Sequence, residues 1–341
     1  MKPALSYFYV PIAAFVVGVT AAFILAGPAV AFTVAVLAIL EISLSFDNAV
    51  VNASVLQNWS PAWRSAFMGL GIIVAVFGMR LVFPIVIVTA TTGLSVSEVV
   101  GLALHDQATY AKHLTAVHGL VAAFGGAFLG MVGLGFFLDD SKDSHWLGWL
   151  EKPLAKLGQI EAVHGAVVMA VVWFVSTFLP GTERMTFIVA GILGFVAFVA
   201  TKAVGSLLSG GGEDSGTSKV IQAGVGGFLY LELLDASFSF DGVIGAFALS
   251  QDLVWITVGL GIGALTVREL TLLAVDRGTL AEYPYLEHGA FWAILSLSGL
   301  MMASAVTEIP ESVTGLIGAG LIGAAFVTSL IKNRYSATAT A

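Results

Sequence analysis

Long apolar runs, separated by short polar or turn-forming segments, make up most of this 341-residue chain. The runs are close to the roughly 20 residues that an α-helix needs to cross a bilayer. Gly-Pro, Ser-Pro and Pro-Gly pairs mark turns between them. The pattern predicts ten membrane-spanning helices, at residues 6–26, 29–56, 64–90, 117–138, 162–179, 186–208, 220–250, 253–275, 289–306 and 312–331. Two longer connections, 91–116 and 139–161, are expected to carry short surface helices.

The composition agrees with this pattern. The chain is 58% hydrophobic and 11% charged, whereas a soluble domain has about 25% charged residues. Mean hydropathy is +0.96. The 39 glycines suit closely packed membrane helices. We therefore expect an all-α polytopic membrane protein.

The basic residues give this arrangement an orientation. With ten spans, ten Lys and Arg residues fall on the side of both termini, and two fall on the other side. Cytoplasmic loops carry such an excess, so both termini are predicted to be cytoplasmic, in the plasma membrane. A cleaved signal peptide is the competing interpretation of the first run. The stretch from about Leu5 to Ala26 is longer than the ~7–15 apolar residues of a signal peptide, which favours a retained helix.

One polar motif interrupts two of the runs. Glu41-Ile-Ser-Leu-Ser-Phe-Asp-Asn48 recurs as Asp235-Ala-Ser-Phe-Ser-Phe-Asp-Gly242, with Asp47 and Asp241 separated by 194 residues. Ionisable residues inside membrane helices are costly and usually functional. The two motif helices cross the membrane in opposite directions if ten spans are correct. This predicts two inverted five-helix repeats, an arrangement typical of secondary transporters.

Other features divide the chain in the same way. Gly69-Leu-Gly-Ile72 matches Gly259-Leu-Gly-Ile262, and a lone arginine follows each, Arg80 and Arg268. We expect a first membrane half at 1–208, a Gly-rich linker at 209–219 and a second half at 220–341. The repeat boundary is expected near 180–185.

Helical geometry raises a conflict within the first motif. Glu41, Ser45 and Asn48 share one helix face, whereas Ser43 and Asp47 lie on another, at 100° per residue. A straight helix cannot direct both faces at one ion. Either the helix is locally broken near the Ser-Phe-Asp step, which Asp47 or Asp241 needs in order to reach a shared site, or one face binds the ion and the other bonds neighbouring helices. If both helices are unbroken, Glu41 and Asp235 are the preferred ligands. Glu232, Asp235 and Ser239 likewise share a face.

These side chains offer hard oxygen ligands, which suit Mn²⁺, Mg²⁺ or Ca²⁺. Protons would compete for the same carboxylates, which suggests proton coupling. A purely structural role, with acids paired to arginines, is the alternative. The predicted ligands are Glu41, Asp47, Asn48, Glu232, Asp235 and Asp241, with Ser45, Ser239, Arg80 and Arg268 in support.

The two motifs, Glu41-x5-Asp47-Asn48 and Glu232-x2-Asp235-x2-Phe238-x2-Asp241, resemble the signatures of the TerC integral membrane family, which is linked to tellurium resistance. The resemblance is closest to an uncharacterised bacterial branch and covers nearly the whole chain. The family is grouped with LysE-like transporters, and some members are implicated in manganese efflux. It therefore implies metal-ion export with the motif acids as ligands. Gly242 departs from the hydroxyl or amide residue found in many TerC proteins.

We expect a secondary transporter that exports a divalent cation, with Mn²⁺ first. The alternatives are a LysE-like exporter of a small organic solute such as an amino acid, and a non-transporting membrane scaffold. The chain has no cysteine and no nucleotide-binding motif. We expect no enzymatic activity, no prosthetic group and no nucleic-acid partner. The expected partners are the ion and the lipid bilayer, and a homo-oligomer is left open.

Overall fold

The computed structural model describes residues 3–139, 142, 144–157, 162–208 and 224–339. Every regular element within these residues is a helix, which confirms the all-α prediction. The elements of the first half are η1 (Ala4–Tyr7), α1 (Tyr9–Ala26), α2 (Pro28–Leu44), α3 (Phe46–Leu56), α4 (Pro61–Ile73), η2 (Val74–Val82), α5 (Phe83–Thr92), α6 (Val96–His105), α7 (Gln107–Ala116), α8 (His118–Phe137), α9 (Gly148–Leu157), α10 (Ala162–Ser176) and α11 (Gly181–Leu208). The second half contains α12 (Val225–Leu249), α13 (Leu253–Arg277), α14 (Thr279–Glu282), α15 (Leu286–Ser304) and α16 (Glu311–Ala339).

Each of the ten predicted runs contains a helix or a helical series, and the two longer connections carry α6, α7 and α9, as predicted. Local chemistry sets several boundaries. Gly27, with φ at 94°, turns the chain between α1 and α2. Pro28 and Pro61 occupy the first turns of α2 and α4, where a missing N–H costs nothing. Ser95 and Glu98 form a capping box at the start of α6.

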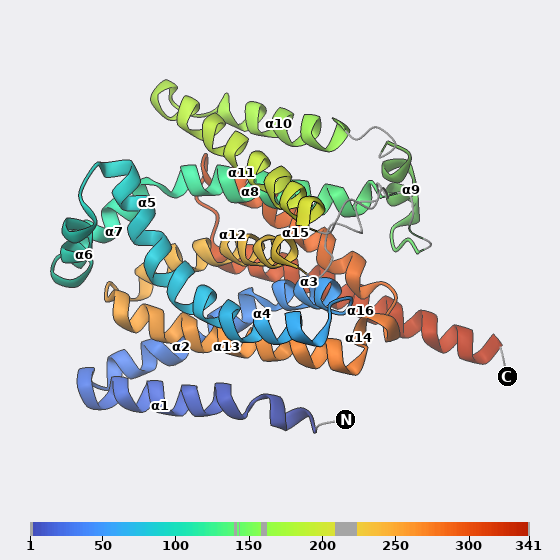
Figure 1. Ribbon diagram of the computed structural model, residues 1–341, viewed down its shortest axis with the longest axis horizontal. Helices are drawn as coiled ribbons and strands as arrows, with labels where there is room; N and C mark the ends of the chain where they lie inside the picture. The colour runs from blue at the N-terminus through green and yellow to red at the C-terminus, as the bar shows by residue number, and fades with distance from the viewer. Residues whose placement is uncertain (1–2, 140–141, 143, 158–161, 209–223, 340–341) are drawn as a thin grey trace.

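Seven described helices are long and apolar enough to cross a membrane, so this is a multi-pass membrane protein. The count is nine if the bent pairs α2–α3 and α9–α10 each form one span. α12 is equally long but carries three acidic residues within its 25 positions. It therefore fails a test of apolar composition while lying among the other helices of the bundle (Figure 1).

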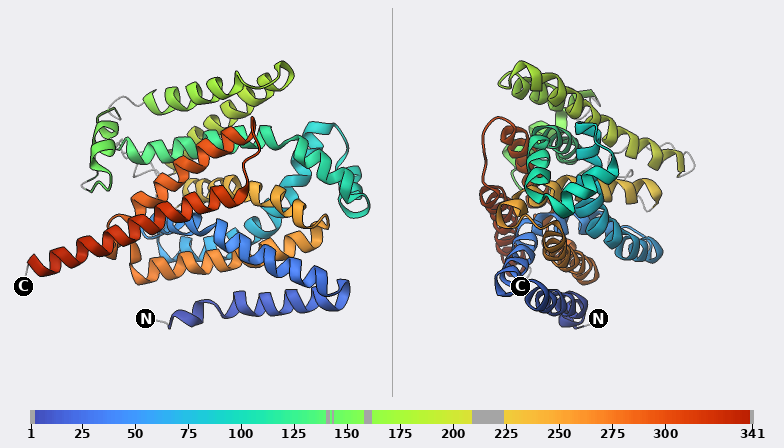
Figure 2. Two further views of the ribbon diagram at one scale, coloured as in Figure 1. Left: turned by 180° about the vertical axis from the view of Figure 1, so that it is seen from behind. Right: turned by 90° about the vertical axis from the view of Figure 1, so that its left-hand side faces the viewer.

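The long helices run roughly along one direction, horizontal in Figure 1. α6 and α7 lie at one end, which we call the α6–α7 end. α9 lies across the helix direction at the other end, the α9 end. The N-terminal element η1 and the last turns of α16 both lie toward the α9 end (Figures 1 and 2). The two described termini are therefore on one side of the bundle.

The two motif helices run in opposite directions. α2 and α3 run toward the α9 end, and α12 runs back toward the α6–α7 end (Figure 1). The helices that follow them in sequence are opposed in the same way, since the α4–η2–α5 series and α13 also run antiparallel. This matches the predicted inversion for two of the five helix pairs. The predicted linker at 209–219 lies outside the described residues.

The main core is built around α8, which is buried between α11 and α15. Glycine allows these backbones to approach closely. A Cβ at Gly194 of α11 would collide with the carbonyl oxygen of Phe124, and one at Gly126 of α8 would lie 3.1 Å from the carbonyl oxygen of Ser298. Close packing of this kind stabilises helix association in lipid, where burial of apolar surface contributes little. This rigid scaffold supports the motif helices beside it.

Candidate ion-binding site at the broken helix

The first motif lies at a break in a helix. α2 ends at Leu44, α3 begins at Phe46, and the two axes differ by 51°. Ser45 separates them with φ −99° and ψ 16°. Polar side chains near the break bond locally, since Asp47 Oδ1 accepts the backbone N–H of Asn48 at 2.9 Å. Short polar side chains compete in this way with helical hydrogen bonding. The sequence left open whether the motif helices are broken, and the structure shows a break at the first motif.

The second motif lies in an unbroken helix. α12 is continuous from Val225 to Leu249 and includes Asp235 and Asp241. The backbone of Asp241 is helical, but its side chain lies outside what the structure describes. The two motifs are therefore equivalent in sequence but differ in conformation, and the break belongs to the first repeat.

Arg80 gathers one group of polar side chains, which we call the Arg80 cluster. Its guanidinium pairs with Glu41, and it also donates to Ser239 Oγ at 3.3 Å. Ser45 Oγ donates to Glu41 Oε1 at 3.1 Å. Arg80 lies in the π-helical segment η2 and donates to the carbonyl oxygen of Ala75 in the same segment. π-Helical turns occur frequently at functional sites.

Arg268 gathers a second group, the Arg268 cluster. Arg268 Nη2 lies 3.1 and 3.4 Å from the two carboxylate oxygens of Glu232 and 3.9 Å from Asp235 Oδ2. Nη1 donates to the carbonyl oxygen of Phe67 at 2.6 Å, and the guanidinium lies 4.1 Å from the centre of the Phe67 ring. Asn48 Nδ2 donates to Asp235 Oδ1 at 2.5 Å. Arg268 is therefore held by two acids, a backbone carbonyl and an aromatic ring.

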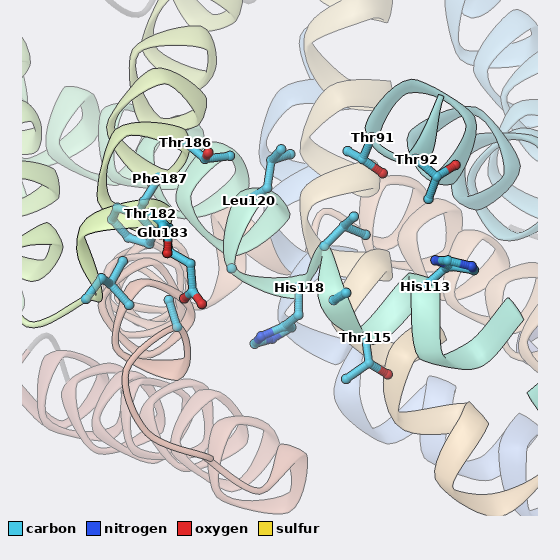
Figure 3. Close-up of a pocket in the computed structure, with 15 residues that line it drawn as sticks. Thr91, Thr92, His113, Thr115, His118, Leu120, Thr182, Glu183, Thr186 and Phe187 are labelled. Carbon is cyan, nitrogen blue, oxygen red and sulfur yellow. The ribbon is translucent and has the colours of Figure 1, made fainter. Parts of the chain in front are cut away.

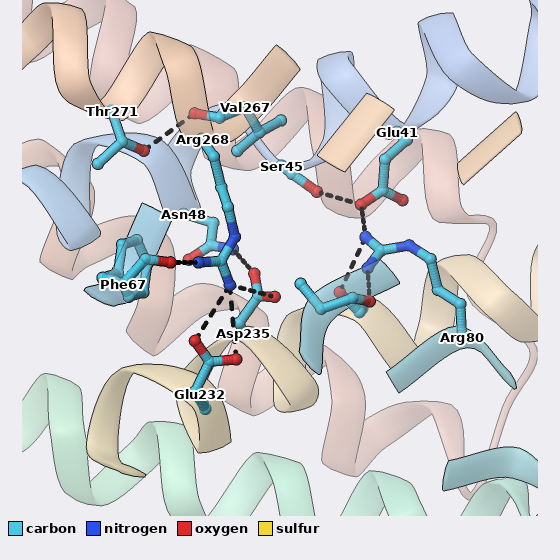
Figure 4. Close-up of polar contacts among 12 residues, drawn as sticks. Glu41, Ser45, Asn48, Phe67, Arg80, Glu232, Asp235, Val267, Arg268 and Thr271 are labelled. Atoms are coloured by element: carbon cyan, nitrogen blue, oxygen red, sulfur yellow. Dashed lines mark hydrogen bonds and ion pairs between the residues drawn. The ribbon is translucent and has the colours of Figure 1, made fainter. Parts of the chain in front are cut away.

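The two clusters lie side by side, and each contains residues from both motifs (Figure 4). Ser239 of the second motif reaches Arg80, and Asn48 of the first motif reaches Asp235. The structure therefore brings together two segments almost 190 residues apart in sequence. Glu41 pairs with Arg80, and Glu232 and Asp235 pair with Arg268, so each of these acids pairs with an arginine on the span that follows its own helix.

Among the side chains that the structure describes around the break, the buried charges do not balance. Four carboxylates are almost completely buried, with exposed fractions of 3% for Glu41, 7% for Asp47, 5% for Glu232 and 7% for Asp235. The guanidinium groups of Arg80 and Arg268 are 1% and 3% exposed. With every carboxylate ionised, two negative charges would remain uncompensated. Buried charge of this kind is unstable unless it is paired, protonated or bound to a metal.

The carboxylates are not gathered into one cage. Among the described residues, no group of three or more His, Asp or Glu side chains is arranged to hold a metal ion. Arg80 and Arg268 instead form ion pairs with Glu41 and Glu232 (Figure 4). A cation that used these acids would have to displace a guanidinium group.

Asp47 faces a cavity rather than an arginine. A cavity of about 330 Å³ is lined by Glu41, Ser45 and Asp47, and it extends to His118 and Glu308. Gly242 also lines it, and a Cβ there would lie 3.4 Å from Glu41 Oε2, so glycine leaves room beside this carboxylate. Because the helix bends at Ser45, Glu41 and Asp47 share one cavity despite lying on different faces of an ideal helix.

A wider cavity of about 560 Å³ lies at the α6–α7 end (Figure 3). It shares Thr115 and His118 with the first cavity, so these two residues lie between the two spaces. Its other polar lining residues are Thr91, Thr92, His113, Thr182, Glu183 and Thr186. The broken helix therefore lies beneath a polar recess at this end.

The structure also gives the positions of polar residues around the site that were not among the predicted ligands. Ser43 does not join the site, because it is exposed and bonds back to the carbonyl oxygen of Ile39. His118 and Glu308, which lie near the ends of two predicted spans, line the first cavity. Asn52 was missed. It lies one turn after Asn48 in α3 and is 2% exposed. An amide within an apolar run was the available signal.

A protein-family model described as "Protein of unknown function (DUF475)" matches residues 46–336. The match includes all of the second motif and the first motif from Phe46 onward, but not Glu41. Comparisons with curated proteins and with solved structures give no match.

Proposed function

We propose that this chain, which belongs to the DUF475 family, is a secondary transporter that exports a hard divalent cation, with Mn²⁺ as the expected ion. The supporting observation is the charge excess at the broken helix. Glu41, Asp47, Glu232 and Asp235 outnumber Arg80 and Arg268 by two negative charges. One divalent cation, or two protons, would neutralise this difference. The resemblance to the TerC family supports the same class of substrate.

The arginines act as internal counter-ions in this proposal. When no metal ion is bound, Arg80 pairs with Glu41, and Arg268 pairs with Glu232 and Asp235. An arriving cation competes with the guanidinium groups for the carboxylates. Protons compete for the same oxygens, so inward proton movement would favour release of the metal ion. This exchange couples metal-ion export to the proton gradient and needs no nucleotide hydrolysis.

The cavities give this exchange a route. The smaller cavity joins Asp47 and Glu41 to His118 and Glu308, and the larger one continues toward the α6–α7 end. With cytoplasmic termini, that end would face outward, because η1 and the end of α16 lie at the opposite end. The described conformation would then be the one that releases the ion to the outside. The bend at Ser45 is the expected hinge for the change back to a conformation that is open to the cytoplasm.

Flux measurements in proteoliposomes test the proposal. Wild type should transport Mn²⁺, and Asp47→Asn and Asp235→Asn should each reduce the initial rate at least tenfold. Asp252→Asn is the matched control, because Asp252 caps α13 through its side chain and asparagine caps equally well. Unchanged transport in both site variants would refute the ion-site assignment. If wild type transports no divalent cation, the proposal that divalent cations are the substrate is refuted.

A small organic cation is the second candidate. The 330 Å³ cavity is larger than a single ion requires, and its lining includes Phe238, Leu300 and Met301 beside the acids. An amino acid or amine could place its ammonium near Asp47 and its apolar part against these side chains. Competition of Mn²⁺ uptake by amino acids at millimolar concentration would favour this candidate. If wild type transports neither class, the non-transporting scaffold becomes the better explanation.

A further inference from the structure

Two buried amide oxygens on α3 have no hydrogen-bond partner among the described residues. They are the Oδ1 atoms of Asn48 and Asn52, and both side chains are 2% exposed. Buried polar groups are almost always satisfied, and each exception calls for an explanation. Two exceptions on neighbouring turns of one helix, beside an excess of carboxylates, point to a ligand that is bound for only part of a cycle.

The direction of these oxygens follows from the contacts around them. Asn48 Nδ2 donates to Asp235 Oδ1 at 2.5 Å, which places the Asn48 amide against α12. Asn52 is four residues later on the same helix face, about 6 Å along the axis. α3 and α12 run antiparallel (Figure 1). The turn of α3 that follows Asn48 therefore corresponds to the turn of α12 that precedes Asp235. Glu232 is in that turn and points toward Arg268 (Figure 4).

The four side chains form a complementary set. Asn48 and Asn52 supply neutral oxygens from one helix, and Glu232 and Asp235 supply charged oxygens from the other. Arg268 now pairs with both acids and compensates one of their two charges. It has a separate anchor on the carbonyl oxygen of Phe67, at 2.6 Å, which would retain it when the acids are engaged elsewhere. Carboxylates and amide oxygens are the ligands that hard divalent cations prefer.

We infer that Asn52 is an ion ligand and that Asn48, Asn52, Glu232 and Asp235 form an inner cation subsite. The inference rests on the proposed function and refines it. In the export direction the ion first displaces Arg268 from the two acids and then passes the break in α2–α3 to the cavity at Asp47. In the subsite, two amide oxygens replace water ligands that the ion loses.

Substitution of Asn52 separates a ligand role from a packing role. Asn52→Leu has nearly the same size and removes an unsatisfied polar group, so the metal-free protein should melt at the wild-type temperature or higher. Its Mn²⁺ affinity should fall at least tenfold, measured by calorimetry on the detergent-solubilised full-length protein. Asn52→Asp adds a charged ligand and should bind Mn²⁺ at least tenfold more tightly. Thr271→Val is the control, because the buried Thr271 hydroxyl already bonds to the carbonyl oxygen of Val267.

The outcomes are distinct for the two proposals. If wild type binds Mn²⁺ and Asn52→Leu binds it equally well, the inner subsite is refuted while the proposed transport function stands. If Asn52→Leu does not fold, an unchanged affinity in Asn52→Asp refutes the subsite in its place. If wild type binds no divalent cation, both proposals fail. Reduced affinity in Asn52→Leu with unchanged affinity in Thr271→Val supports the inference.

Discussion

Replacement of Arg268 by glutamine tests whether this residue is the counter-ion for two buried acids. Arg268 Nη2 lies 3.1 Å from Glu232, and at an effective dielectric constant of about 20 this separation corresponds to an attraction of about 5 kcal/mol. Removal of one partner from a buried ion pair typically costs about 3–5 kcal/mol. The total stability of a folded protein is about 5–15 kcal/mol. Arg268→Gln should therefore lower the melting temperature markedly in metal-free buffer.

Two further measurements make this prediction specific. The double variant Arg268→Gln/Glu232→Gln removes both charges and should recover most of the lost stability. Mn²⁺ should raise the melting temperature of Arg268→Gln more than that of wild type, because no guanidinium competes with the ion. The seven tryptophans provide an intrinsic fluorescence signal for melting in detergent. A wild-type melting temperature for Arg268→Gln in metal-free buffer would show that our reading of the Arg268 cluster is wrong.

Two remaining predictions concern packing and pH. A Cβ at Gly263 would overlap the side chain of Glu41, so Gly263→Ala should lower the free energy of unfolding by about 1–3 kcal/mol. Gly299→Ala is the control and should not destabilise, because no atom lies within 4 Å of the added Cβ. Chemical or thermal unfolding in detergent compares the two variants, and equal stability would contradict the described packing at Gly263. Burial lowers the pKa of Lys142, in the connection after α8, from 10.5 to about 8. Between these values the unfolded chain binds more protons than the folded protein, so stability should rise from pH 8 to 10.5. Lys142→Met should remove this part of the pH dependence, and an identical pH profile would contradict the assignment.

The sequence predicted the helices well because their signals are local. The structure confirms α2 and α4, which follow from an apolar run with proline in the first turn, and α13, which follows from its apolar run alone. The sequence raised a break in the first motif helix as one of two possibilities, and the structure places it at Ser45. The polar residues of the motif lie on incompatible faces of an ideal helix, and a bend of 51° allows Glu41 and Asp47 to share a cavity.

The partners of each acid could not be read from the sequence. Arg80 and Arg268 were expected near the acids, but their pairing depends on how separate spans pack. Arg80 is 39 residues from Glu41 and 159 from Ser239, and it bonds to both. The chain also has no local feature that assigns Asn48 to Asp235. Distances of this kind are set by helix packing across the whole bundle.

By itself, the sequence determined that the protein is helical and crosses the membrane several times, and it identified two acidic motifs as the costly polar sites. These properties follow from residue composition and periodicity, which act within a single helix. Only the tertiary structure decided that the charges divide into two arginine-centred clusters, that Asp47 faces a cavity, and that Asn48 and Asn52 retain unpaired oxygens. Those properties arise where antiparallel helices meet, and no single segment contains them.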